Sequence, residues 1–213
     1  MSQQSQPPGR SAFEVAVLSR LPGFSSTDEY FFVEPLQHVM SGFVCEKTPR
    51  GAYIWKFVFP LFDPFKTVSL SYSQRLAWPA GYIDFKEVPK ALLAQEFVRR
   101  IEPHAKYSKL LLSLPEFRKY LAHRPETARH EHLEMVLGFT YILIGEQSLA
   151  ALHLGQALPR MRPEYREYCE RVLDALADGL DSAQREVLSI EVSVRQRLGL
   201  PAVSGGHERS PQA

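Results

Sequence analysis

The amino-acid sequence predicts an α+β protein, with an N-terminal three-stranded antiparallel meander and flanking helices, followed by a C-terminal helical bundle or array of helical hairpins. Two observations predict this class. Between residues 43 and 76 the residues become aromatic and β-branched, and apolar side chains recur with the period of two that is typical of strands. From residue 87 onward the apolar spacing is helical, and prolines divide the chain into segments.

The chain divides into four parts by composition. Residues 1–10 and 201–213 are rich in Ser, Gln, Pro, Gly and charge, so we expect two disordered tails with little apolar area to bury. Between the tails we expect an α+β module over 11–86 and a helical module over 87–200 that packs on it.

The first module is expected to begin with two helices. Residues 11–21 have helical apolar spacing and are followed by Pro22 and Gly23, which stop a helix. The stretch from Tyr30 to Met40 is expected to become helical near Glu34-Pro35, because proline is accepted in a first helical turn, with Gly42 as the C-terminal stop.

Three strands are then predicted, over 43–47, 52–59 and 67–73, with Thr48-Pro-Arg-Gly51 as the first turn. On the central strand one face is aromatic, because side chains two residues apart share a face: Tyr53, Trp55, Phe57 and Phe59. In the third strand apolar residues alternate with hydroxyl-bearing ones, so we expect one apolar side that helices cover.

A linker over 82–85 leads to the predicted helices. Prolines and apolar spacing place them at 89–101, 105–114, 115–122, 126–144, 147–158, 163–180 and 182–198.

One of these helix pairs has the spacing of small and large residues typical of a helix–turn–helix repeat. The residues that carry the pattern are Leu137, Gly138, Tyr141, Gly145, Ala150, Leu154 and Ala157. Residues 131–163 therefore resemble a single tetratricopeptide hairpin, although Glu134 stands at the early tryptophan position and the closing proline is displaced to Pro163. The resemblance implies close helix packing, and in that family such surfaces usually bind peptides or partner proteins. No second copy and no whole-chain family are recognisable.

Composition and motifs exclude several function classes. Lys and Arg total 25 against 24 for Asp and Glu, so a nucleic-acid partner is not expected. The N-terminus lacks the features of a signal peptide, and no apolar stretch is long enough for a membrane span, so we expect a cytoplasmic protein without a membrane partner. The chain has no nucleophile or phosphate-binding motif, and Cys45 and Cys169 form no CxxC pair. We therefore assign no catalytic residue and no cofactor.

A cluster of potential metal ligands occurs at His130-Glu131-His132-Leu133-Glu134. His130 and Glu134 share a helical face, but a zinc protease motif requires a second histidine where Glu134 stands. We interpret the cluster as a solvated helical face, and no metal site is predicted.

Two groups of residues are candidates for contact with a partner. The first is the aromatic pair Tyr53 and Trp55, of the residue types that dominate interfaces, with core packing as the alternative. The second is a basic stretch with interspersed acids, for which a solvated helix surface is the alternative; its candidate residues are Arg99, Arg100, Arg118, Arg124 and Arg129.

The function expected from these features is that of a non-enzymatic protein-binding module with a heteromeric protein partner. A bacterial immunity or defence-accessory protein, which occludes a partner's functional surface, fits a small chain with few motifs. The alternatives are a hydrolase-type enzyme whose site is assembled in space, or a structural subunit of a larger complex.

Overall fold

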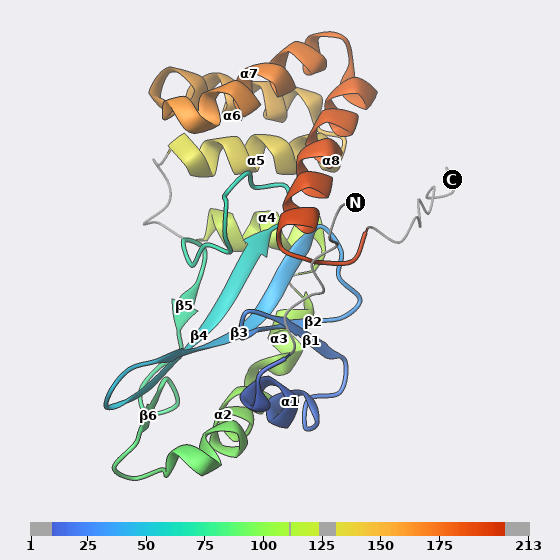
Figure 1. Cartoon of the computed structure of the whole chain (residues 1–213). Coiled ribbons are helices and arrows are strands. Elements are labelled where there is room, and N and C mark those ends of the chain that lie inside the picture. The colour runs from blue at the N-terminus through green and yellow to red at the C-terminus, as the bar shows by residue number, and fades with distance from the viewer. Residues whose placement is uncertain (1–9, 111, 124–130, 203–213) are drawn as a thin grey trace, which may run out of the picture.

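The computed structural model describes residues 10–110, 112–123 and 131–202 of the chain. An antiparallel sheet is followed by helices, which confirms the predicted α+β class (Figure 1). The strand order is β1-β2-β3-β4-β5, and β6 also pairs with β4. The strands are β1 (Phe24–Thr27), β2 (Tyr30–Val33), β3 (Val39–Lys47), β4 (Gly51–Pro60), β5 (Gln74–Arg75) and β6 (Tyr82–Asp84).

The central hairpin of the sheet is formed by β3 and β4, which contain the first two predicted strands. Their antiparallel register runs from Val39 opposite Pro60 to Lys47 opposite Ala52. At the turn, the Thr48 hydroxyl accepts a hydrogen bond from the Gly51 N–H (3.1 Å). Phe57 and Phe59 are fully buried, whereas Tyr53 and Trp55 on the same face are half-buried. The aromatic face of β4 is therefore divided between core and surface.

The helix expected between Glu34 and Met40 is wrong. Residues 30–33 form β2, β3 begins at Val39, and Gly42 lies inside β3 rather than ending a helix. Between the strands, the Leu36 N–H donates to the Glu34 carboxylate (2.9 Å). The physical reason is burial: the aromatic and β-branched residues on both sides are buried when they pair in the sheet, which outweighs the weak preference of a proline for a helix start.

The third strand predicted over 67–73 is also wrong. Only Gln74 and Arg75 pair with β4 at this point, and the preceding residues form a loop. In that loop the Ser69 and Ser71 hydroxyls hydrogen-bond each other (2.6 Å), and such local bonds compete with strand pairing. Tyr72 is buried in the core, and the expected linker over 82–85 contains β6.

The other predicted helices are present with shifted ends. They are α1 (Ala12–Leu18), α2 (Leu93–Ile101), α3 (Ala105–Leu110), α4 (Leu114–Ala122), α5 (Glu131–Leu143), α6 (Gln147–Ala157), α7 (Pro163–Ala177) and α8 (Leu180–Arg197). Among the described residues, 3₁₀ turns adjoin them at Lys90–Leu92, Glu102–His104 and Leu158–Arg160. The expected start of α5 at residue 126 lies outside the described residues. None of the described helices is both long and apolar enough to cross a bilayer.

The hairpin of α5 and α6 packs closely at the glycine that the sequence pattern singled out. A Cβ atom on Gly138 would lie 2.5 Å from Cγ of Leu154, which is fully buried in α6. Gly145, between the helices, has a φ of +88°, a conformation that favours glycine. The small residues therefore set the distance between these two helices.

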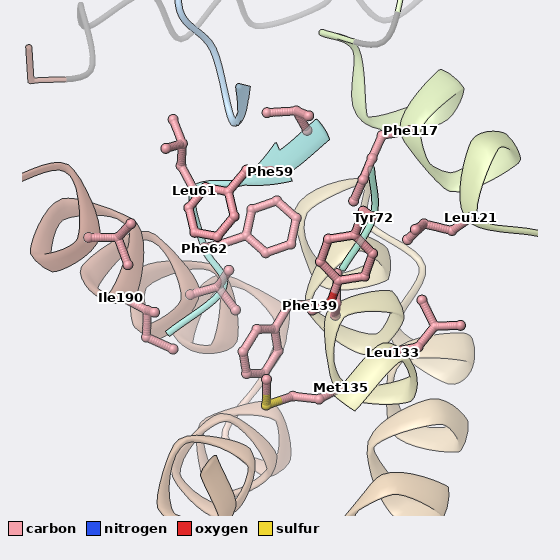
Figure 2. Packing of buried hydrophobic residues seen from close by; sticks show 14 of the residues in the cluster. Phe59, Leu61, Phe62, Tyr72, Phe117, Leu121, Leu133, Met135, Phe139 and Ile190 are labelled. Atoms are coloured by element: carbon pink, nitrogen blue, oxygen red, sulfur yellow. The ribbon is translucent and has the colours of Figure 1, made fainter. Parts of the chain in front are cut away.

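The buried apolar residues in the described part of the chain form two clusters. In the first, α1 and α2 cover one end of the sheet, through contacts that include Val17, Phe31 and Phe97. The second, larger cluster joins the other end of β4 to α4–α8 (Figure 2), and its members include Phe59, Phe139 and Ile190. In Figure 1 the sheet accordingly lies between α1 and α2 on one side and the C-terminal helices on the other.

A buried ion pair within α8 also contacts the loop between β2 and β3. The Arg195 guanidinium donates to the Glu191 carboxylate (2.8 Å), and the side chains of both residues are at most 2% exposed. Arg195 also donates to the backbone carbonyl of Gln37, and Glu191 contacts Nδ1 of His38 (2.7 Å). The sheet and the last helix are therefore joined by polar as well as apolar contacts.

Candidate partner-binding surface

A row of stacked aromatic and guanidinium groups lies where β5 and β6 pair with β4. We call it the aromatic ladder, and its members in order are Trp55, Arg75, Tyr53, Tyr82 and Trp78. The Arg75 guanidinium carbon lies 4.6 Å from the ring centroid of Trp55 and 4.0 Å from that of Tyr53. Tyr53 and Tyr82 have ring centroids 4.9 Å apart, and the Trp78 ring stacks on Tyr82 at 6.2 Å with an interplanar angle of 22°.

Strand register explains why these residues meet. Trp55 lies opposite Arg75 in the β4–β5 pair, and Tyr53 lies opposite Tyr82 in the β4–β6 pair. Residues directly opposite in antiparallel strands have side chains in contact, so four of the five members are cross-strand neighbours. Figure 1 shows β5 and β6 along this side of β4.

The fifth member, Trp78, comes from the loop between β5 and β6 and is 80% exposed. No other large hydrophobic residue in the described part of the chain is as exposed. Because one face of the ring stacks on Tyr82, the side chain is oriented by the ladder while most of its surface remains in water.

Charges at the other end of the ladder compensate one another. The indole N–H of Trp55 donates to the Glu46 carboxylate (2.8 Å), which also lies 3.7 Å from the Arg75 guanidinium. The ladder therefore combines large ring faces with little uncompensated charge at this end. Such amphipathic aromatic surfaces are typical of protein interfaces.

The loop that carries Trp78 is held in one conformation by backbone contacts. The Gly81 N–H donates to the Ala77 carbonyl (2.9 Å), and a Cβ atom on Gly81 would lie 1.9 Å from the Leu76 carbonyl oxygen, so only glycine fits. From α2, the Arg100 guanidinium donates to the backbone carbonyls of Pro79 and Tyr82. Arg100 therefore supports the ladder by holding this loop and is not itself a member of the ladder.

Arg100 is in turn held by Glu96. The Glu96 carboxylate accepts hydrogen bonds from Arg99 and Arg100, both at 2.6 Å. The Arg99 hydrogen bond, followed by that of Arg100 and the charges of both, outweighs desolvation and lowers the pKa of Glu96 to about 2. The Glu96 carboxylate thus stays ionised and orients the guanidinium that fixes the loop.

The structure distributes the predicted partner-binding residues unevenly. Tyr53 and Trp55 belong to the ladder, and Arg100 supports it. Arg99 is exposed and contacts Glu96, whereas Arg118 lies on α4 with its guanidinium 5.9 Å from the Tyr141 ring centroid. The two remaining candidates, Arg124 and Arg129, lie outside the described residues. Arg118 is not brought to the ladder by any contact of the described residues.

Sequence reasoning missed Arg75, Trp78 and Tyr82. Only the unusual Trp-Pro-Ala-Gly segment at 78–81 gave a signal, because a tryptophan beside turn residues is expected at a surface. The stack itself depends on pairing of β5 and β6 with β4, which no local pattern predicted.

A second notable group of side chains is buried beside α5. The Asp63 carboxylate, fully buried, accepts hydrogen bonds from Nε2 of His132 (2.9 Å), the Tyr72 hydroxyl (3.2 Å) and the Phe65 N–H (3.3 Å). Burial, and then the charge of Asp63, raises the pKa of Tyr72 well above its usual value, so the hydroxyl stays protonated and donates.

This histidine borders a cavity of about 210 Å³ but offers it little basic surface. Nε2 of His132 contacts Asp63, and Nδ1 has essentially no accessible surface. The ring packs against Phe65 and Tyr165, with centroids 4.3 Å and 4.9 Å away. The aspartate therefore fixes an aromatic floor of the cavity rather than a proton acceptor that a substrate could reach.

The cluster predicted to be a solvated helical face is therefore partly buried. His132 is buried next to Asp63, and Glu134 pairs with Nδ1 of His153 (2.6 Å), while His130 lies outside the described residues. Within residues 10–110, 112–123 and 131–202, no group of three or more His, Cys, Asp or Glu side chains could hold a metal ion.

Comparison of the chain with protein-family models, with curated proteins and with solved structures gave no match in any of the three.

Proposed function

We propose that this protein is a non-enzymatic binding module whose partner is another protein that contacts the aromatic ladder. The observation that carries the proposal is Trp78, a large aromatic side chain that is 80% exposed yet oriented by stacking on Tyr82. Tryptophan is enriched among the residues that contribute most to interface stability. An oriented ring also loses little side-chain entropy on binding, which favours affinity.

The supporting contacts favour the same function. Gly81 and Arg100 hold the loop from two sides, so the surface is formed before a partner arrives. A preformed rigid surface suits occlusion, in which the protein covers a functional site of its partner as an immunity or defence-accessory protein does. The near-neutral net charge of +1 favours a protein partner over nucleic acid.

The test is photo-crosslinking in the native host from a benzoyl-phenylalanine placed at residue 78. The matched control places the same probe at Leu152, which is 52% exposed on α6 and is not part of the ladder. We expect a discrete adduct from position 78 alone, with the same protein co-purifying at stoichiometric yield. Identical adducts from both positions, or none from position 78, would refute the proposal.

Direct titration with the purified partner then measures the contribution of each residue. Trp78→Ala is expected to weaken binding by about 2 kcal/mol or more, roughly thirtyfold, as at other interface hot spots. Arg100→Ala is expected to weaken binding, because it removes the guanidinium that holds the loop. Arg99→Ala is the control, because among the described residues the Arg99 guanidinium contacts Glu96 and not a loop carbonyl. Equal affinities for Trp78→Ala and the unmodified protein would exclude the ladder as the binding surface.

A further inference from the structure

The cavity beside His132 has the composition of a small-ligand site. Its floor consists of three aromatic rings in mutual contact, Phe65, His132 and Tyr165, with Phe65 and Tyr165 centroids 5.3 Å apart. Met161, which is 5% exposed, adds an apolar wall. These four side chains form a surface suited to an apolar, and especially an aromatic, group.

The His132 ring of this floor is held by a hydrogen bond to Asp63. His132 is 6% exposed and lines the cavity, while its Nε2 contacts both oxygens of the fully buried Asp63, at 3.0 Å and 2.9 Å. A buried ionisable group of this kind costs free energy unless it is hydrogen-bonded, and here the bond also orients the ring. The Asp63 carboxylate therefore holds the His132 ring in place in the lining of the cavity.

The cavity also has charges of both signs in its lining. Arg162 supplies a guanidinium, and Glu131, at the start of α5, supplies a carboxylate. Helix α7 begins at Pro163, directly after Arg162, so the positive end of its dipole lies next to this residue. The Arg162 side therefore favours an anion, and the Glu131 side favours a cation.

The volume of about 210 Å³ limits the occupant further. It is smaller than the roughly 300–1,000 Å³ of cavities that hold drug-sized ligands. A single amino acid is small enough for this volume and carries one anion, one cation and one apolar group.

We propose that this cavity binds a free α-amino acid with an aromatic side chain. The ring lies on the floor of Phe65, His132 and Tyr165, the α-carboxylate pairs with Arg162, and the α-ammonium is directed to Glu131. The Glu131 carboxylate already has an interaction within the protein, and each carboxylate oxygen can accept from more than one donor. The site shares no residue with the aromatic ladder, and its test does not depend on partner binding.

Methionine methyl NMR tests the proposal directly, because the chain contains only four methionines. Met161 lines the cavity, whereas Met40 and Met135 are fully buried in the core and serve as internal controls. With L-phenylalanine as the probe, we expect a saturable shift of the Met161 methyl resonance, caused by the ring current of the ligand, and no comparable shift of the Met40 and Met135 resonances.

Three analogues and two variants distinguish the parts of the site. Phenethylamine lacks the carboxylate, 3-phenylpropionate lacks the ammonium and L-alanine lacks the ring, and each is expected to bind more weakly than L-phenylalanine. Arg162→Gln is expected to weaken L-phenylalanine binding about tenfold, the value of one charge-assisted contact. Arg166→Gln, an exposed α7 arginine paired with Glu170 (3.0 Å), is the matched control and should bind as the unmodified protein does.

The proposal is overturned if Met161 shows no saturable shift at millimolar L-phenylalanine. It is equally overturned if phenethylamine binds as tightly as L-phenylalanine, or if Arg162→Gln leaves the affinity unchanged. Because both variants change surface arginines, they are expected to fold, and the unperturbed Met40 and Met135 resonances verify that they do.

Discussion

Two glycines of the α5–α6 hairpin allow the packing distance between these helices to be measured as a free energy. Gly138 lies in α5 and Gly155 in α6, and both are inside helices. A Cβ atom added to Gly138 would lie 2.5 Å from Cγ and 2.6 Å from Cδ2 of Leu154, whereas one added to Gly155 has no atom within 4 Å. The same substitution, glycine to alanine, therefore has opposite steric consequences at the two positions.

The expected magnitudes follow from two effects. Alanine is favoured over glycine in a helix by about 0.8–1 kcal/mol, which applies at both positions. At Gly138 the clash is with a fully buried leucine that has little space to move, and overpacking of this kind costs roughly 1–3 kcal/mol. Because helix propensity cancels in the comparison, Gly155→Ala should be more stable than Gly138→Ala by about 1–3 kcal/mol.

Urea unfolding of the two variants, followed by circular dichroism, measures this difference. Thermal unfolding gives a second readout, since 1 kcal/mol corresponds to roughly 2–4 °C for a chain of this size. Gly155→Ala should unfold at a higher midpoint than the unmodified protein. If Gly138→Ala were as stable as Gly155→Ala, the close approach of α5 and α6 at Leu154 would be refuted.

Three further predictions concern ionisable groups. Burial raises the pKa of Cys45 to about 12 and that of Cys169 to about 11. Both thiols should therefore resist Ellman's reagent at pH 8 in the folded protein and react when the protein is unfolded in guanidinium chloride. Rapid labelling of the folded protein would contradict this. The folded-state pKa of Glu96 is lowered to about 2, so the ionised carboxylate stabilises the fold above its ordinary pKa of 4.5, and this stabilisation is lost as the pH falls towards 2. Carboxyl ¹³C NMR should show the low titration midpoint of Glu96, and Arg100→Gln should raise this midpoint. Glu191→Gln leaves the buried Arg195 without its counter-charge and should destabilise the fold by about 3–5 kcal/mol in urea unfolding, whereas a loss below about 1 kcal/mol would show that the pair is not buried in solution.

Local sequence patterns predicted most elements of the fold because each element has a local cause. Ser11 both accepts from the Glu14 N–H and donates its own N–H to the Glu14 carboxylate, a capping box that is readable as a spacing of three residues. The stretch over 34–40 was mispredicted because its strands are stabilised by partners elsewhere in the chain: Phe32 pairs with Gly42, and Met40 pairs with Phe59. Tertiary burial there overrides the local preference of proline.

The candidate sites were harder to predict for the same reason. Tyr53 and Trp55 could be identified, since alternation along one strand places them on one face. Their neighbours Arg75 and Tyr82 come next to them through the pairing of β5 and β6 with β4. The alternation of residues along one strand does not predict which other strand pairs with it or in which register. The contact between Asp63 and His132 spans 69 positions and had no local signal at all.

The ladder and the core depend on different contacts, and this difference makes the proposed function separable from folding. Trp78 is 80% exposed, so its replacement removes little buried area, and a surface substitution of this kind changes stability by about 0.5 kcal/mol or less. Arg100→Ala, in contrast, frees the backbone carbonyls of Pro79 and Tyr82 and should increase the mobility of the loop without emptying either apolar cluster. Trp55 and Trp78 are the only tryptophans of the chain, and they lie at the two ends of the ladder. Acrylamide quenching of tryptophan fluorescence therefore reports on these two ends. Quenching of Trp78 should be suppressed by the bound partner while that of Trp55, already half-buried, changes less; the reverse order would place the interface at the Glu46 end of the ladder.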